Sequence, residues 1–248
     1  MKIKGIQSES FIDYPKGLST VLFVGTCPYR CGSCHAKGLL ESDQEYTEQE
    51  IISFLESRKK SINKVVITGG EPTKEKGLIS FIEELGKRNF DIKLDTNGSA
   101  YEILLEIKDK KLVNYIAMDV KGPLHLYPQL VGVKKINVAG LVESPIKIVS
   151  QFPDYEFRTT IVPILDNSQI RWLSPEEIKQ TAELIQASTG SKYHKYFLQR
   201  FVAPKKNEVI NPIFSKDHLL EEFHKTPKKY LEECLFEAQK ILPNTRIR

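Results

Sequence analysis

Hydrophobic and polar positions along the chain follow two alternating patterns. Short, nearly continuous apolar runs predict six buried strands, at residues 20–24, 64–68, 91–95, 115–119, 156–162 and 196–201. Stretches with apolar residues three and four positions apart predict helices at residues 48–59, with Thr47 as the N-cap, 77–88, 101–108, 136–150 and 175–187. Strands and helices that alternate in this way are typical of β-α units around a parallel sheet.

Six β-α units are two fewer than a closed eightfold barrel needs. The charged tail, residues 204–248, carries a turn signal at Asn211-Pro212 and predicts one more helix at residues 227–241, packed on the outside. No linker separates this tail from the core at about residues 15–203. We therefore expect one α/β domain, residues 1–248, with a C-terminal helical extension.

Composition narrows the classes of partner. The 36 basic and 32 acidic side chains give a formal net charge of +4 and are dispersed along the chain, so we expect no nucleic-acid partner. No apolar stretch approaches the roughly 20 residues that cross a bilayer, so we expect no membrane association. No signal peptide opens the chain, and we expect a reducing, cytoplasmic compartment.

A cluster of three cysteines, Cys27, Cys31 and Cys34, follows the first predicted strand. Three thiolates at this spacing can bind three irons of a cubane cluster and leave the fourth iron without a protein ligand. A structural zinc site that includes His35 is an alternative, although two adjacent residues are poorly placed to bind one tetrahedral ion, and free thiols are another. Cys234 lies far away in a charged segment and is interpreted as a helix residue.

Polar residues and glycines gather where the other predicted strands end. They are Gly69, Gly70 and Glu71 after the second strand, Asp95 and Asn97 at the third, Asp119 and Lys121 at the fourth, and Arg158 within the fifth. The carboxyl ends of parallel strands share one face in β-α folds, and ligands bind there. The sequence therefore predicts that these residues converge with the cysteines on one pocket.

Each of these motifs also has a simpler interpretation. The paired glycines, and Asn97 with the glycine after it, are ordinary turn dipeptides. Asp119 and Lys121 can form a surface ion pair of little energetic value, and Asp95 can cap the following helix. Their combination with the three cysteines, in this order and at corresponding strand ends, favours a functional site.

The combination resembles the radical S-adenosylmethionine (SAM) superfamily. Within it the chain is similar to the activating enzymes of glycyl radical enzymes, in the longer form that serves anaerobic ribonucleoside-triphosphate reductase. The resemblance spans about residues 6–201, and the cysteine motif with Gly-Gly-Glu-Pro is its most specific part. It depends on residues 11–15 (Phe-Ile-Asp-Tyr-Pro), 27–35, 69–72 (Gly-Gly-Glu-Pro), 94–98 (Leu-Asp-Thr-Asn-Gly), 118–121 (Met-Asp-Val-Lys), 156–160 (Glu-Phe-Arg-Thr-Thr) and 198–201 (Leu-Gln-Arg-Phe).

The resemblance implies a partial (β/α)6 TIM-like barrel of the radical SAM type. It also implies that Cys27, Cys31 and Cys34 ligate a [4Fe-4S] cluster, whose open iron is chelated by the amino and carboxylate groups of SAM. The activity implied is reductive cleavage of SAM to a 5′-deoxyadenosyl radical, which removes a hydrogen atom from a glycine of the partner enzyme. The implied partners are anaerobic ribonucleotide reductase and a flavodoxin or ferredoxin that donates the electron.

The remaining site residues take their roles from the same resemblance. Gly69, Gly70 and Glu71 would receive the ammonium group of SAM, and Arg158 would bind its methionyl carboxylate through two parallel donors. Asp95 and Asp119, with the backbone carbonyl of Lys121, would hold a monovalent cation, and Asn97 would join the cofactor-binding residues.

The chain departs from the family pattern at two positions. Related enzymes carry an aromatic residue that packs on adenine just before the third cysteine, where this chain has Ser33. Gln199 replaces a histidine found in some pyruvate formate-lyase activases, which favours the reductase as partner. Two other functions stay open: a radical SAM enzyme for a small molecule, such as 7-carboxy-7-deazaguanine synthase, and a non-catalytic zinc-binding adaptor.

Overall fold

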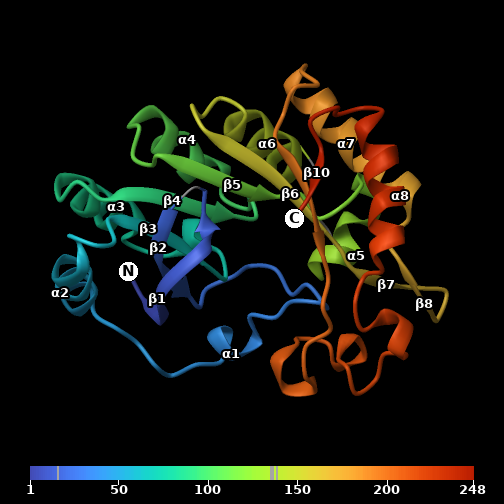
Figure 1. Ribbon diagram of the computed structural model, residues 1–248, viewed down its shortest axis with the longest axis horizontal. Coiled ribbons are helices and arrows are strands. Elements are labelled where there is room, and N and C mark those ends of the chain that lie inside the picture. The colour runs from blue at the N-terminus through green and yellow to red at the C-terminus, as the bar shows by residue number, and fades with distance from the viewer. Residues whose placement is uncertain (16, 135–136, 138) are drawn as a thin grey trace.

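In the computed structural model of the protein, residues 1–15, 17–134, 137 and 139–248 are described. The central sheet has the strand order β1-β2-β3-β4-β5-β6-β9-β10 (Figure 1). Six of its strands run parallel to one another: β2 (Gly17–Val24), β3 (Lys64–Gly69), β4 (Asp91–Thr96), β5 (Tyr115–Asp119), β6 (Tyr155–Ile161) and β9 (Tyr196–Arg200). The six strands predicted from the apolar runs are thereby confirmed.

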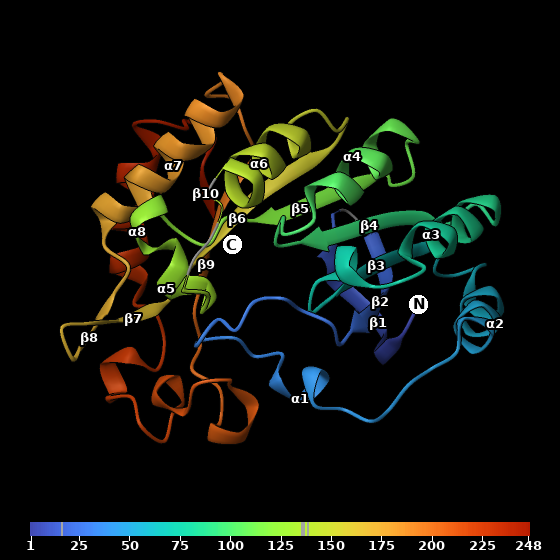
Figure 2. The same ribbon diagram turned by 180° about the vertical axis from the view of Figure 1, so that it is seen from behind.

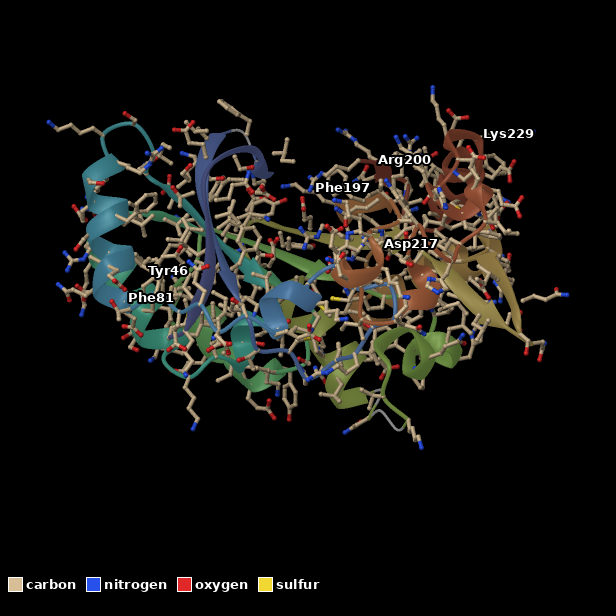
Figure 3. The ribbon with its side chains drawn as sticks, turned by 90° about the horizontal axis from the view of Figure 1, so that it is seen from below. Tyr46, Phe81, Phe197, Arg200, Asp217 and Lys229 are labelled. Atoms are coloured by element: carbon tan, nitrogen blue, oxygen red, sulfur yellow. The ribbon has the colours of Figure 1, made fainter. Side chains whose placement is uncertain are left out.

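Two further strands form the edges of the sheet. β1 (Ile3–Tyr14) pairs antiparallel with β2, and β10 (Arg246–Ile247) pairs parallel with β9. The sheet order leaves these two edges unpaired with each other, so the sheet curves without closing. Seen from below, Phe197 and Arg200 of β9 lie across the concave face of the sheet from β1 (Figure 3). The architecture is therefore the α/β, open-barrel type that the sequence predicts.

Helices surround the outer, convex face of the sheet (Figures 1 and 2). They are α2 (Glu48–Arg58), α3 (Leu78–Lys87), α4 (Tyr101–Asp109), α6 (Ser144–Val149), α7 (Pro175–Thr189) and α8 (Lys228–Gln239). Two shorter helices, α1 (Lys37–Leu40) and α5 (Tyr127–Val131), lie beyond the carboxyl ends of the strands. Apolar residues of the strands, such as Ile67 and Ile116, pack against apolar residues of the helices, such as Phe81 and Leu104, in the main core. Because successive side chains of a strand alternate between its faces, the intervening residues point to the concave side.

Local signals explain why the helices begin where they do. The hydroxyl of Thr47 accepts a hydrogen bond from Glu50 N, and the Glu50 carboxylate accepts one from Thr47 N, so a capping box starts α2 as predicted. Ser174 and Glu177 form the same box at the start of α7. That helix ends at Gly190, whose φ of 72° is the left-handed conformation that glycine tolerates best.

The sequence prediction missed several elements, among them the short helices α1 and α5 and strand β10. The helix expected at residues 136–150 falls partly on 136 and 138, which lie outside the described residues; Ala139–Glu143 form a π-helical turn, and only Ser144–Val149 are α-helical. Strand β1 was not predicted. Nor was the hairpin of β7 (Pro163–Asp166) and β8 (Gln169–Trp172), whose turn residues Asn167 and Ser168 both have positive φ.

The extension that follows β9 begins with three short 3₁₀ turns, at Lys206–Glu208, Pro212–Phe214 and Glu221–Phe223. The second turn starts at Asn211, whose side chain accepts a hydrogen bond from Ile213 N, in agreement with the predicted turn. Helix α8 then packs against α7, as expected for a helix on the outside. None of the helices in the described part of the chain is both long and apolar enough to cross a bilayer.

Candidate active site

The three clustered cysteines lie on the loop between β2 and α1. Cys27, Cys31 and Cys34 are free, partly exposed thiols, whereas Cys234 is buried in α8, as predicted for a helix residue. All three clustered thiols line a cavity of about 430 Å³. The cavity lies at the carboxyl ends of the parallel strands, the usual ligand-binding face of such folds. Of the eleven residues that the sequence predicted for the site, ten line this cavity, and Glu71 does not.

Close contacts on two sides hold the cysteine loop. On one side lies Gly132, at the end of α5, where a Cβ atom would come within 2.2 Å of the Arg30 carbonyl oxygen. On the other side Asn211 N donates to the Gly32 carbonyl at 3.1 Å, and the Phe214 ring lies 2.7 Å from where a Cβ of residue 32 would stand. The extension therefore contributes directly to the shape of the loop.

Two N–H groups donate to the cysteine sulfurs. The side-chain amide of Asn97 donates to Cys27 Sγ at 3.6 Å, and Ala36 N donates to Cys34 Sγ at 3.4 Å. Burial raises the pKa of Cys27 to about 11, and a bound metal would remove that proton. Donors directed at sulfur are a common feature around thiolate-ligated clusters, so these residues fit a sulfur-rich metal centre.

The spacing of the side chains does not suit a single metal ion. Within the described ranges, which omit residues 16, 135, 136 and 138, no three His, Cys, Asp or Glu side chains come close enough together to hold one ion. A mononuclear zinc site needs four ligands around one centre, whereas each thiolate on a cubane binds a different iron.

The two glycines at the end of β3 allow the cysteine loop to lie against the sheet. Gly69 has a φ of 109°, and a Cβ there would come within 2.6 Å of the Val24 carbonyl oxygen. A Cβ on Gly70 would lie 2.3 Å from the Thr26 carbonyl oxygen. Gly69 and Gly70 therefore form a tight turn and also part of the cavity wall, so both interpretations of the glycine pair hold together.

Glu71 is placed differently from the sequence prediction. Its side chain is fully buried behind the cavity wall rather than facing the ligand space. Its carboxylate accepts hydrogen bonds from Thr73 N at 3.1 Å, Thr96 Oγ1 at 2.8 Å and Asn97 N at 2.6 Å. Burial raises the pKa of Glu71, against the opposing effect of these donors. In this arrangement the carboxylate is occupied by donors of the protein, and its expected contact with the ammonium group of SAM stays a prediction.

A network of ion pairs forms the opposite wall of the cavity. Arg158 Nε donates to Asp119 Oδ1 at 2.9 Å, and its Nη1 donates to Asp95 Oδ2 at 3.2 Å. Lys121 Nζ donates to the other oxygen of Asp119 at 3.0 Å. The ammonium group of Lys93 pairs with Asp95 Oδ1. Every oxygen of the two aspartates thus already has a cationic partner within the protein.

These pairs also determine the protonation of the site. Burial alone would raise the pKa of Asp119, but Arg158 and Lys121 outweigh it and hold that pKa well below its usual range. Burial would lower the pKa of Lys121, but Asp119 and the neighbouring cysteines outweigh it and raise that pKa. Asp95 does not cap the following helix, because α4 has Ala100 at its N-cap with no side-chain cap. Asp119 and Lys121 are therefore charged at neutral pH.

Sequence reasoning missed Lys93. This side chain is only 1% exposed and lies two residues before Asp95, on the same face of β4. The available signal was a lysine between Ile92 and Leu94 in a predicted buried strand, since lysine is almost never fully buried unless it is paired.

An aromatic pair in the cavity was also missed. The rings of His35 and Phe201 lie edge to face with centroids 5.7 Å apart, and both residues line the cavity. Ser33 and Gln199, the two departures from the family pattern, line it as well. The cavity therefore has aromatic surface from other positions, although residue 33 supplies none.

Comparison with known proteins decides the family. Residues 21–171 match the model of the radical SAM superfamily. This chain belongs to the radical SAM superfamily. The matched segment includes all three clustered cysteines and both aspartates of the ion-pair network, and membership implies a [4Fe-4S] cluster and SAM as cofactors.

Two curated relatives bear on the branch of the superfamily. A protein of Methanocaldococcus jannaschii, provisionally named a glycyl-radical enzyme activating enzyme, is 31% identical over 94% of this chain and 94% of its own length. The 7-carboxy-7-deazaguanine synthase of Rickettsia prowazekii is 34% identical, but only over 41% of this chain and 44% of that protein. The likeness to the first relative thus extends through the extension, and the likeness to the second does not cover the whole chain.

A solved structure confirms the fold. Streptococcus suis SuiB bound to S-adenosylmethionine superposes with a TM-score of 0.57 and 15% identity. The match covers 92% of this chain and 49% of the SuiB chain, so this chain spans about half the length of that protein. At this level of identity the comparison concerns the fold alone.

Proposed function

We propose that this protein is an activating enzyme that installs a glycyl radical on a partner enzyme, with anaerobic ribonucleoside-triphosphate reductase as the partner. The observation that carries the proposal is the 31% identity, over nearly the full length of both chains, to the provisionally named activating enzyme of M. jannaschii. The cavity lined by three free cysteines supports the cofactor part of the proposal.

The three cysteines would hold a [4Fe-4S] cluster, and no other cysteine of the chain lies near enough to fill the fourth position, since Cys234 is in α8. When bound and reduced, the cluster would supply the electron for reductive cleavage of SAM, and the hydrogen atom removed afterwards would come from a glycine of the partner enzyme. The protein binds and orients the reactants and excludes water. We propose a flavodoxin or ferredoxin as the electron donor and a reducing, cytoplasmic location, which keeps the thiols unpaired.

The ion-pair network would bind the carboxylate of SAM. Arg158, Lys121 and Arg200 line the cavity with three formal positive charges against two negative charges on Asp95 and Asp119, so the lining is net positive. A net positive wall attracts a carboxylate, and a guanidinium supplies parallel donors for it. A monovalent cation at the two aspartates, which the family resemblance implied, would have to displace side chains that already fill all four carboxylate oxygens. We therefore assign this wall to the carboxylate rather than to a cation.

The ammonium group of SAM would meet backbone carbonyls of Gly69 and Gly70, which form the cavity wall beside the cysteine loop. An ammonium group needs acceptors, and glycines allow the ligand to approach the backbone closely. Glu71 would then serve this wall from behind, through its hydrogen bond to Asn97 N, rather than by direct contact.

The test is activation of a glycyl radical enzyme under anaerobic conditions. The protein, reconstituted with iron and sulfide, is mixed with reductant, SAM and anaerobic ribonucleotide reductase, and the mixture is examined by electron paramagnetic resonance. The expected result is a persistent glycyl doublet that is absent without SAM. Cleavage of SAM with no doublet on any glycyl radical partner would contradict the proposal and favour a small-molecule substrate, as for 7-carboxy-7-deazaguanine synthase.

A further inference from the structure

One of the three cysteine sulfurs accepts a hydrogen bond from a side chain. We infer that Asn97 is a positioning residue that raises the reduction potential of the cluster through its N–H bond to Cys27 Sγ, and that Glu71 holds Asn97 in place. This inference rests on the cluster of the proposed function. The sequence predicted only that Asn97 is one of the cofactor-binding residues. Here Asn97 receives a specific role, as the side chain that tunes the iron-sulfur cluster.

The amide of Asn97 has a fixed orientation. Its Nδ2 lies 3.6 Å from Cys27 Sγ, and its Oδ1 accepts a hydrogen bond from Ser99 N at 3.0 Å. Because the oxygen is committed to a backbone N–H, the NH₂ group is the part of the amide that faces the sulfur. The side chain is largely buried, at 7% exposed, so water competes little for this bond.

Glu71 anchors the backbone of the same residue. Its Oε2 accepts from Asn97 N at 2.6 Å, while its Oε1 accepts from Thr96 Oγ1 at 2.8 Å and from Thr73 Oγ1 at 2.5 Å. Both oxygens of the Glu71 carboxyl group thus accept hydrogen bonds, from the end of β4 and from the turn after β3. The end of β4 is thereby tied to the end of β3, and the amide of Asn97 is set before any metal binds.

The sign of the effect follows from electrostatics. Reduction by one electron adds negative charge to a cluster and to its thiolate ligands, so an N–H donor to sulfur stabilises the reduced state more than the oxidised state. Hydrogen bonds to the sulfurs are among the factors that set cluster potentials. Cys34 Sγ receives its donor from the backbone of Ala36, which substitution leaves in place, whereas the donor to Cys27 Sγ can be deleted.

The experiment is an anaerobic redox titration of the reconstituted protein, followed by the absorbance and electron paramagnetic resonance of the cluster. For Asn97→Leu we expect the midpoint potential to fall, so that the ratio of reduced to oxidised cluster at the wild-type midpoint drops about tenfold, equivalent to about 59 mV for a one-electron couple. Asn97→Asp keeps the shape of the side chain but replaces the N–H donor with a negative charge. We expect the midpoint potential of this variant to fall at least as far as that of Asn97→Leu.

Ser99→Ala is the matched control. Among the described residues the Ser99 hydroxyl is buried without a partner, and its backbone N–H to Asn97 survives the substitution, so we expect the wild-type potential. An Asn97→Leu or Asn97→Asp protein that holds full iron and sulfide at the wild-type potential, or at a higher one, would overturn the inference. If Asn97→Leu assembles no cluster, Asn97→Asp decides alone. If the wild-type protein itself assembles neither iron nor sulfide, the proposed function fails instead.

Discussion

Two fully buried glutamates, at opposite ends of the parallel strands, obtain their partners in different ways. Glu156, near the start of β6, is gripped by the guanidinium of Arg248 at 2.6 and 2.9 Å and accepts a hydrogen bond from Tyr115 Oη at 2.8 Å. Glu71, after the carboxyl end of β3, receives only backbone N–H and hydroxyl donors, from Thr73, Thr96 and Asn97.

The difference shows how positive charge is divided between the two ends of the sheet. A buried carboxylate needs donors or a counter-ion, because isolation from water costs several kcal/mol. At the end with Glu156 a guanidinium is used to hold the fold together. At the end with Glu71, uncharged N–H and hydroxyl donors satisfy the buried carboxyl group instead. The cationic groups of the cavity therefore remain on the wall that a ligand can reach. The cavity end should therefore govern chemistry, and the other end stability.

The largest expected effect is at the cavity end. Cys31→Ala removes one of three cluster ligands, so we expect loss of the four-iron cluster and complete loss of reductive SAM cleavage, with the fold retained. Iron and sulfide analysis with an anaerobic SAM-cleavage assay checks this, and Cys234→Ala is the matched control that should keep both. If Cys31→Ala cleaved SAM at the wild-type rate, the cluster would have to be held by other ligands.

The next effect is at the opposite end. Arg248→Ala leaves the Glu156 carboxylate buried without its counter-ion, and because Arg248 itself is partly exposed we expect a loss of about 2–3 kcal/mol in the free energy of unfolding. Urea unfolding followed by circular dichroism measures it. Cluster content and SAM cleavage should stay at wild-type levels at low temperature. An unfolding midpoint equal to that of the wild type would mean that Glu156 needs no counter-ion.

A smaller effect tests the positive wall. Arg158→Lys keeps the charge but loses the planar fork, so we expect the cluster to assemble and the Kd for SAM to rise about tenfold. Calorimetric titration of the cluster-loaded protein measures the affinity. Arg171→Lys changes an arginine that pairs with Glu177 outside the cavity and should leave Kd unchanged. Unaltered SAM binding by Arg158→Lys would remove the carboxylate role proposed for Arg158.

The smallest expected effect is that of the monovalent cation in the buffer on SAM binding. Because all four oxygens of Asp95 and Asp119 have cationic side-chain partners, exchange of sodium for potassium at constant ionic strength should change the Kd for SAM by less than about twofold. The same titration in choline chloride provides the reference. A strong dependence on one cation would restore the role that the family resemblance gave to the two aspartates.

The sequence predicted the parallel part of the fold well, because its strands are buried on both faces and read as apolar runs. Strand β1 escaped prediction because it lies at the sheet edge, with exposed polar residues such as Gln7 and Glu9 interrupting its apolar ones. The hairpin of β7 and β8 turns at Asn167-Ser168, which lacks the glycine that usually marks such a turn.

Prediction of the site from the sequence was limited in a similar way. Strand order and the position of strand ends brought ten predicted residues to one cavity, since the carboxyl ends of parallel strands share a face. The direction of the Glu71 side chain could not be predicted in the same way, because it depends on a glycine turn with positive φ just before it. Lys93 escaped because the burial of its pair with Asp95 depends on packing by neighbouring strands, which become adjacent only on folding.

The contact between the cysteine loop and the extension sets an order of events during maturation. Gly32 is held by Asn211, and Phe214 fills the space beside it, yet these residues are separated by most of the barrel in the order of synthesis. The segment that carries the sulfur ligands leaves the ribosome long before its support exists. Iron and sulfide are thus best inserted after translation is finished, into a folded and complete chain.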